Sequence, residues 1–194
     1  MSVIRQLSLF GVEASAPEPA DLAGLLIAGG EIVRADDTAQ VSIVVGHPWR
    51  AAAIVAECGR RGLAATSVST VTSYVGVRTS YSSALAGLAR SWTDEVGRRP
   101  PRDLRLDARV LRLWAMAVGH REGTSYALPV GESDQAFRDV LGAGLAGLGL
   151  AAQLVSRRGT GEPTFRIVGK RRLDRLVEMV GDAPRQAPPD MWPS

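Results

Sequence analysis

The sequence of 194 residues contains one cysteine, Cys58, and two histidines, His47 and His120. A single cysteine excludes an intrachain disulfide, and so few soft ligands argue against a structural zinc site. No apolar run reaches the roughly 18 residues that a membrane span needs, and the N-terminal apolar stretch is too short for a secretory leader. These absences predict a cytoplasmic protein without a metal, a cofactor or a membrane partner.

Asparagine is also absent, and Lys170 is the only lysine, so arginine carries nearly all of the positive charge. The planar guanidinium suits bidentate phosphate binding better than an ammonium group does. The composition is that of a globular protein, with 45% hydrophobic and 22% charged residues, and the pI of about 9.6 is compatible with a nucleic-acid partner.

The sequence repeats itself at a spacing of about 88 residues. The string GLAA occurs at 62–65 and again at 149–152, and Arg78 and Arg166 lie 88 positions apart. Leucines recur at the same offset, at 85 and 88 and then at 173 and 176. This pattern indicates a tandem duplication.

Each copy shows the order α-β-β-α-β-β-α, which predicts an α+β fold with antiparallel sheets. In the first copy we expect helices at 19–28, from 47 onward and at 82–92, and strands at 31–34, 40–46, 63–69 and 74–80. In the second we expect helices at 104–118, 133–147 and 171–180, and strands at 124–130, 150–157 and 164–169.

The two repeats lie between segments that are rich in proline or poor in regular pattern. We expect a flexible N-terminal segment at 1–18, the first repeat at 19–95, a basic linker at 96–103, the second repeat at 104–181, and a flexible Pro-rich tail at 182–194.

The first helix of the first repeat carries the string LAGLLIAGG, in which Leu22-Ala23-Gly24-Leu25 and Gly30 stand out. Together with the repeat, it resembles the motif of the LAGLIDADG homing endonucleases. The corresponding string in the second repeat, 111–119, keeps the terminal glycine but departs from the motif elsewhere, with Trp114 and Met116 inside it. The resemblance implies two motif helices that pack across a pseudo-twofold axis, and two curved antiparallel sheets that lie on DNA.

The resemblance also implies that metal-dependent cleavage has been lost. In the nucleases the acid at the eighth motif position binds the divalent metal. This sequence has Gly29 and Val118 at the eighth position, and neither side chain can bind a metal ion. We therefore expect no catalytic residue, as in the bacterial sporulation regulators whose LAGLIDADG domain no longer cuts.

A short string near the N-terminus resembles the pentapeptide with which bacterial polymerases and repair proteins dock on the DNA sliding clamp. Its residues are Gln6, Leu7, Ser8, Leu9 and Phe10. An extended peptide of this kind offers an amide for hydrogen bonding and two apolar anchors for a pocket. The alternative is a terminal segment whose apolar residues pack on the domain.

Basic residues concentrate in the linker and in the second repeat, where they can neutralise DNA phosphates. The candidate DNA contacts are Arg78, Arg98, Arg99, Arg157, Arg158, Arg166, Lys170, Arg171 and Arg172. A solvated protein surface is the alternative, because acids such as Asp174 and Glu178 are interspersed among them.

Together these observations predict a monomeric, nucleoid-associated DNA-binding protein that is recruited to the sliding clamp (the β subunit) in replication or repair. Two alternatives stay open. One is a metal-dependent endonuclease whose acids have moved, to Asp36, Asp37 or Glu122. The other is an adaptor that uses the clamp peptide and the tail around Trp192 and does not touch DNA.

Overall fold

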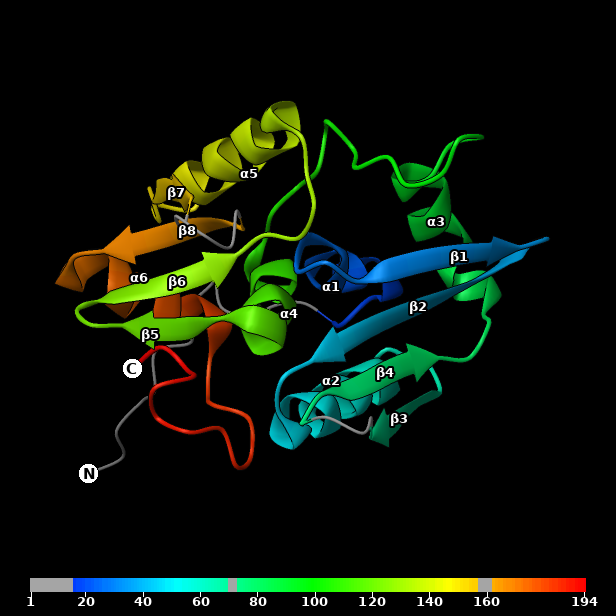
Figure 1. Cartoon of the computed structure of the whole chain (residues 1–194), viewed down its shortest axis with the longest axis horizontal. Coiled ribbons are helices and arrows are strands. Elements are labelled where there is room, and N and C mark those ends of the chain that lie inside the picture. The colour runs from blue at the N-terminus through cyan, green and yellow to red at the C-terminus, as the bar shows by residue number, and fades with distance from the viewer. Residues whose placement is uncertain (1–15, 70–72, 157–161) are drawn as a thin grey trace, which may run out of the picture.

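The computed structural model describes residues 16–69, 73–156 and 162–194, which form two lobes of the same topology (Figure 1). The first lobe consists of η2 (Pro19–Leu22), α1 (Ala23–Ile27), β1 (Glu31–Ala35), β2 (Thr38–Val45), α2 (Pro48–Arg60), β3 (Ala65–Ser69), β4 (Val75–Thr79), η3 (Ser83–Leu85) and α3 (Ala86–Trp92). The second consists of α4 (Ala108–Val118), β5 (His120–Glu122), β6 (Ser125–Pro129), α5 (Gln135–Gly147), β7 (Gln153–Ser156), β8 (Pro163–Val168) and α6 (Lys170–Val180).

The sheets confirm the expected α+β fold and its duplication. The first sheet has the strand order β1-β2-β4-β3 and the second has the order β5-β6-β8-β7, with every pairing antiparallel. In β4 the buried Val75 and Val77 alternate with the more exposed Gly76 and Arg78. This alternation leaves one face of the sheet for the helices and the other for solvent.

Capping residues determine where the helices of the second lobe begin. The Asp107 carboxylate accepts the backbone N–H groups of Arg109 and Val110, both at 2.9 Å, so α4 begins at 108 and not at the expected 104. Asp134 caps α5 in the same way through Phe137, at 2.7 Å. The strand β5 was not among those placed from the sequence, because three polar residues carry no alternating pattern.

The helices α1 and α4 pack against each other at the centre of the molecule. A Cβ atom on Gly24 of α1 would lie 2.2 Å from the carbonyl oxygen of Val110 in α4, so the two backbones approach as closely as glycine allows. The core around them includes Trp92, Trp114 and Cys58. Burial raises the pKa of the Cys58 thiol to about 11, which fits a core residue and not a nucleophile.

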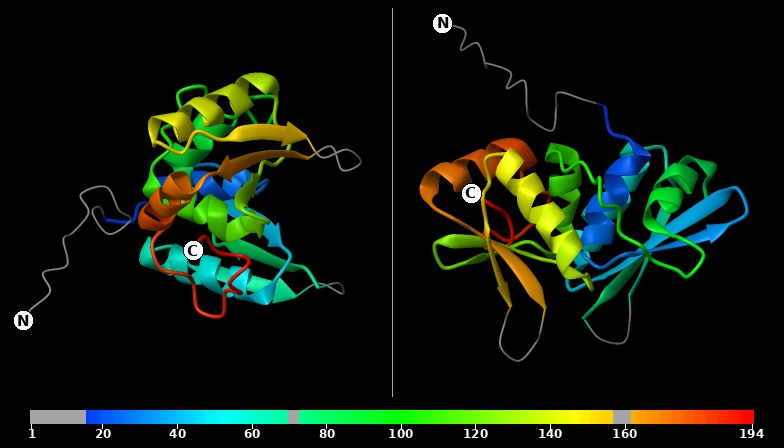
Figure 2. Two further views of the ribbon diagram at one scale, coloured as in Figure 1. Left: turned by 90° about the vertical axis from the view of Figure 1, so that its left-hand side faces the viewer. Right: turned by 90° about the horizontal axis from the view of Figure 1, so that it is seen from above.

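The helices cover one side of both sheets. Seen from above, in the right panel of Figure 2, the strands diverge from the helix layer toward the open side. The side chains that point to this side form what we call the concave face. They are Glu31, Val33, Gln40, Ser42, Val44, Thr66, Val68, Gly76 and Arg78 in the first lobe, and Glu122, Ser125, Ala127, Gln153, Thr164, Arg166 and Val168 in the second.

The C-terminal segment 182–194 is not the flexible tail that its prolines suggested. Trp192 is 4% exposed and its indole N–H donates to the Gly181 carbonyl at 3.0 Å. The Arg121 backbone N–H donates to Asp190 at 2.7 Å, so the segment also covers the edge of β5. One buried indole and a few backbone hydrogen bonds hold the segment against the second lobe despite its composition.

The linker 96–103 is likewise attached to the body. Thr93 and Arg98 form an antiparallel bridge, and the Arg99 backbone N–H donates to the Trp92 carbonyl at 2.7 Å. In the part of the chain that the structure describes, no helix is long and apolar enough to cross a membrane.

Candidate nucleic-acid interface

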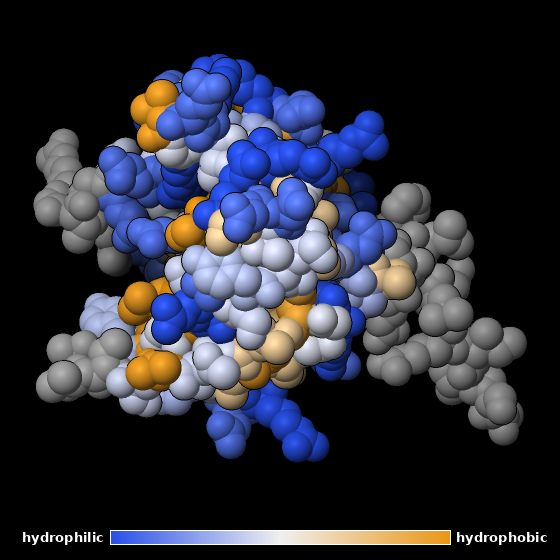
Figure 3. Space-filling view, turned by 90° about the vertical axis from the view of Figure 1, so that its right-hand side faces the viewer, coloured by the Kyte–Doolittle hydropathy of each residue, from blue (hydrophilic) through white to orange (hydrophobic). Residues whose placement is uncertain are grey.

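The concave face of the first lobe is a hollow of about 530 Å³ over the first sheet. Its side chains are mostly small, polar or aliphatic, and its two charged residues are Glu31 and Arg78. Three of its valines are well exposed, Val33 at 48%, Val44 at 63% and Val68 at 62%. In Figure 3, which looks at the outer end of this lobe, several hydrophobic side chains lie on the left, where the concave face is seen edge-on. This face therefore offers apolar groups and hydroxyls around a single guanidinium.

Arg78 and Arg166 occupy corresponding positions of β4 and β8, as the repeat predicted, and both lie on the concave face. Arg78 is exposed and lies between Ser42 of β2 and Thr66 of β3 in the strand register. Arg166 instead donates to the Glu122 carboxylate from Nε, at 3.1 Å, and from Nη2, at 2.6 Å. The same position is thus free in one lobe and neutralised in the other.

The other predicted DNA contacts divide among several places. Lys170, Arg171 and Arg172 lie at the start of α6, on the helix side of the molecule and away from the concave face (Figure 2). Lys170 pairs with Asp174 at 2.7 Å. The predicted basic cluster is therefore not one surface, because the turn after β8 carries the chain to the opposite side of the sheet.

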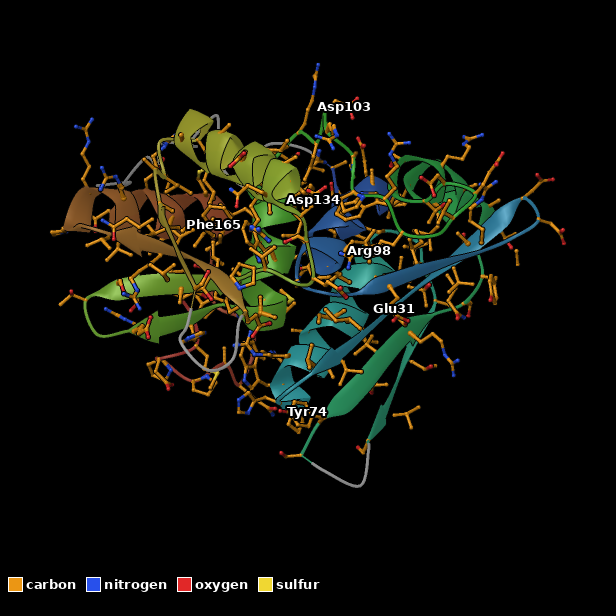
Figure 4. The ribbon with its side chains drawn as sticks, turned by 45° about the horizontal axis from the view of Figure 1, so that its top comes forward. Glu31, Tyr74, Arg98, Asp103, Asp134 and Phe165 are labelled. Atoms are coloured by element: carbon orange, nitrogen blue, oxygen red, sulfur yellow. The ribbon has the colours of Figure 1, made fainter. Side chains whose placement is uncertain are left out.

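The linker arginines have partners within the protein. The Arg98 guanidinium donates to the Leu26 carbonyl at 2.6 Å and lies over the Trp92 ring, while Arg99 pairs with Asp94 at 3.7 Å. Figure 4 shows Arg98 beside the end of α1, near Glu31. Arg98 is thus a structural residue of the first lobe. Arg157, Arg158 and the clamp peptide 6–10 lie outside the described residues.

The end of α1, where a nuclease would hold its metal acid, is closed by backbone. Gly29 has φ +97°, and a Cβ atom on Gly131 would lie 2.3 Å from the Gly29 Cα. The Gly131 backbone N–H donates to the Ile27 carbonyl at 2.9 Å. The loop after β6 therefore fills this position, and glycine is required there for steric reasons.

At the end of α4, the carbonyl oxygens accept hydrogen bonds from an arginine side chain instead. Arg50 of α2 is 4% exposed and donates to the carbonyls of Met116 and Gly119, both at 2.6 Å, and of Ala115, at 3.2 Å. A guanidinium that occupies the carbonyl end of a helix compensates the unpaired oxygens and the helix dipole. At the eighth motif position itself, glycine and valine offer no side-chain oxygen for a divalent metal. The acid beside the α1 end is Glu31, the first residue of β1.

The acids proposed as relocated metal ligands are not brought together. Asp36 and Asp37 form the turn at the outer tip of the β1–β2 hairpin, whereas Glu122 lies in the other lobe and pairs with Arg166. Within residues 16–69, 73–156 and 162–194 there is no group of three or more His, Cys, Asp or Glu side chains that could hold a metal ion.

A buried ionic cluster between the lobes was missed by sequence analysis. Arg61 pairs with Asp21 at 2.9 Å and with Glu57 at 2.7 Å, and Arg112 of α4 reaches Glu57 at 3.2 Å. Burial raises the pKa of Glu57, but the two arginines outweigh it and the pKa is lowered overall. The residues are scattered in sequence and stand among ordinary surface charges, so no local pattern distinguishes them.

Comparisons with known proteins identify the fold. No protein-family model and no curated protein matches the chain. Among solved structures, the homing endonuclease I-WcaI bound to its DNA recognition sequence matches with a TM-score of 0.63 and 12% identity, over 86% of this chain and 82% of that one. The N-terminal LAGLIDADG domain of DUF199/WhiA matches with a TM-score of 0.59 and 10% identity, over 85% of this chain and 82% of that one.

A third match is the crystal structure of I-DmoI in complex with DNA and Mn, with a TM-score of 0.53 and 12% identity, over 85% of this chain and 97% of that one. At these identities the comparisons establish the fold, which is LAGLIDADG-like, as the motif resemblance implied.

Proposed function

We propose that this LAGLIDADG-like protein binds duplex DNA on its concave face without cutting it, and that its N-terminal peptide recruits it to the sliding clamp. The main observation in support of DNA binding is that the two sheets have the same strand order and together form a single concave side. I-WcaI, which has a similar fold, is bound to its DNA recognition sequence in its structure. DNA binding would make the protein nucleoid-associated, and the internal duplication lets it act as a monomer.

Matched charge reversals test the location of the DNA. One variant, R78E/R166E, reverses two cations on the concave face, and the other, K170E/R171E, reverses two on the helix side. Both change the net charge by the same amount, so nonspecific electrostatics change equally. Fluorescence anisotropy with a labelled 30-base-pair duplex should show that R78E/R166E loses at least tenfold in DNA affinity and that K170E/R171E loses less than threefold. Equal losses would place DNA elsewhere than the concave face.

The absence of cleavage is supported by the two closed helix ends, at Gly29–Gly131 and at Arg50. We expect supercoiled plasmid to remain intact in Mg²⁺ or Mn²⁺ at protein concentrations that saturate binding. Nicked or linear product that is lost in D36N, D37N or E122Q would establish the endonuclease alternative. Product that persists in all three would indicate a contaminating nuclease.

Recruitment to the clamp rests on residues 6–10. The described chain begins at residue 16 on the helix side, where Arg109 donates to the Ala16 carbonyl. Calorimetric titration of a bacterial sliding clamp should give micromolar binding that is lost in L9A/F10A and retained in K170E/R171E. Clamp binding without any salt-dependent DNA binding would instead support the adaptor alternative.

A further inference from the structure

The two lobes differ at one register position, and the difference decides whether the arginine of the concave face is free. In the second lobe Glu122 pairs with Ser125 of β6, diagonally across from Arg166. In the first lobe the equivalent position is Val33, which pairs with Gln40 of β2. A carboxylate thus reaches the arginine in one lobe, and an aliphatic side chain takes its place in the other.

The free guanidinium of Arg78 is placed to donate to a ligand. It has no hydrogen-bond or ion-pair partner within the described residues, and Ser42 and Thr66 beside it carry hydroxyls. Glu31, the carboxylate of this face, lies beyond Ser42 in the same row and forms no ion pair with Arg78. Five N–H donors in a planar fork match the O6 and N7 acceptors of guanine in the major groove. The same contact from Arg166 would first require separation from Glu122.

An apolar notch lies beside Arg78 along the same strand. Gly76 lies between Val44 and Val68 in the strand register, and these two valines are more exposed than Val33. A Cβ atom on Gly76 would meet no atom closer than 3.8 Å. Aliphatic groups on a surface that faces a major groove recognise the thymine 5-methyl group. Two residues along a strand span about 6.6 Å, which is close to two base-pair steps.

The concave face of the second lobe offers fewer groups for such contacts. Ala127, beside Arg166 in the register, is fully buried, and Ser125 is 6% exposed with its hydroxyl donating to the Glu122 carbonyl at 2.7 Å. With Arg166 also held by Glu122, this sheet has a paired guanidinium where the first sheet has a free one. Its exposed groups are Gln153 and Val168, and Val168, at 37%, is less exposed than Val44 or Val68.

We infer that the protein reads base sequence with its first lobe only, through guanine contact by Arg78 and thymine-methyl contact by Val44 and Val68, while the second lobe binds DNA without base preference. This inference rests on the proposed DNA binding. It predicts an asymmetric target with one specified half, although the fold itself is nearly symmetric.

Selection from a pool of duplexes with 24 random base pairs tests the inference. The wild-type protein should enrich one short motif that contains a guanine and, about two positions away, a thymine. R78A should lose about tenfold in preference for that guanine, measured as the ratio of its affinity for the selected duplex to its affinity for the unselected pool. R166A, the matched variant in the second lobe, should leave the selected motif unchanged.

Modified bases in the selected duplex then isolate each contact. Replacing the guanine with 7-deazaguanine removes the N7 acceptor, and replacing the thymine with uracil removes only the methyl group. Each change should weaken wild-type binding several-fold. The 7-deazaguanine change should have no effect on R78A, and the uracil change should have none on V44S/V68S.

A gain-of-function pair completes the test. V33E should neutralise Arg78 as Glu122 neutralises Arg166, and so abolish the guanine preference, whereas E122V should free Arg166 and extend the selected motif into a second half. Binding to the pool without any enriched motif, or a motif lost in R166A and kept in R78A, would overturn the inference and leave the proposed function standing. Failure to bind the pool at all would overturn both.

Discussion

The carboxyl ends of α1 and α4 are equivalent by the internal repeat, yet they are closed by different means. The end of α1 meets the backbone of Gly131 and one guanidinium, that of Arg98, which comes from the linker. The end of α4 receives three hydrogen bonds from Arg50, which comes from the other lobe. The comparison shows that a duplicated fold can keep its geometry while each copy satisfies its helix end with different residues.

This difference has a consequence for how the lobes are joined. Arg50 and the cluster of Asp21, Glu57, Arg61 and Arg112 connect α2 and η2 of the first lobe to α4 of the second. The α1 end adds the hydrogen bond from the Gly131 backbone to the Ile27 carbonyl and a long one, 3.5 Å, from Arg98 to the Glu132 carbonyl. We therefore expect α4 to be the element on which the association of the lobes depends.

The largest effect should come from the contact that both helices share. G24A would place a Cβ atom 2.2 Å from the Val110 carbonyl and force α1 and α4 apart, with a loss of about 3 kcal/mol or more in the free energy of unfolding. The same substitution at Gly87, where a Cβ atom meets nothing within 4 Å, should stabilise by about 0.5 to 1 kcal/mol. Urea denaturation of both variants checks this, and similar values for the two would contradict close packing at Gly24.

The second-largest effect on stability should distinguish the end of α4 from the end of α1. R50M leaves three buried carbonyls without their cation and should cost about 3 kcal/mol, whereas R98M, at an exposed residue, should cost about 1 kcal/mol. The substitution is the same at both sites, so denaturant midpoints can be compared directly. A larger loss at Arg98 would mean that the α1 end carries more of the stability.

The C-terminal segment contacts two arginines, Arg50 and Arg112, that hold α4 in place. Arg112 lies over the Trp192 ring at 5.2 Å, and Met191 accepts a hydrogen bond from Arg50 at 3.3 Å. W192A should cost about 2 kcal/mol, less than a central core truncation, because the segment can detach locally. R185A, an exposed change in the same segment, should be neutral. If W192A is neutral as well, the segment does not contribute to stability.

The smallest effect is a pH dependence that arises at Glu57. Its pKa is lower in the folded state than the unfolded value of about 4.3, so its contribution is complete above that value and is lost as the pH falls through the folded pKa. Denaturation from pH 7 to pH 3 should show a steeper loss of stability for the wild type than for E57Q. Parallel curves would show that Glu57 is not held by Arg61 and Arg112.

Local patterns in the sequence predicted most of the fold. The motif glycines, the spacing of 88 and the alternation of apolar residues led to both sheets and to the central helices. The position of the basic residues was not predictable, because the sequence neighbours Arg166 and Lys170 lie on opposite sides of a sheet. The ordered tail was also missed, since Trp192 is buried by residues that are distant in sequence.

The same limit applies to the candidate site. The repeat paired Arg78 with Arg166, and the structure confirmed that they correspond, but only the strand register reveals that Glu122 neutralises one of them. Arg50 and Arg138 also lie 88 positions apart in the sequence. Arg138, however, donates to Ser133 in its own lobe, so similarity between the copies did not predict the contact across the interface.

The central claim is that duplex DNA lies on the concave face, and photo-crosslinking tests it most directly. A benzophenone side chain is placed at Val44, on the concave face, or at Arg171, on the helix side, and each variant is irradiated with a labelled 30-base-pair duplex. We predict a crosslinked species from position 44 and none from position 171. Crosslinking from position 171 alone would contradict the account and place the DNA on the opposite side of the protein.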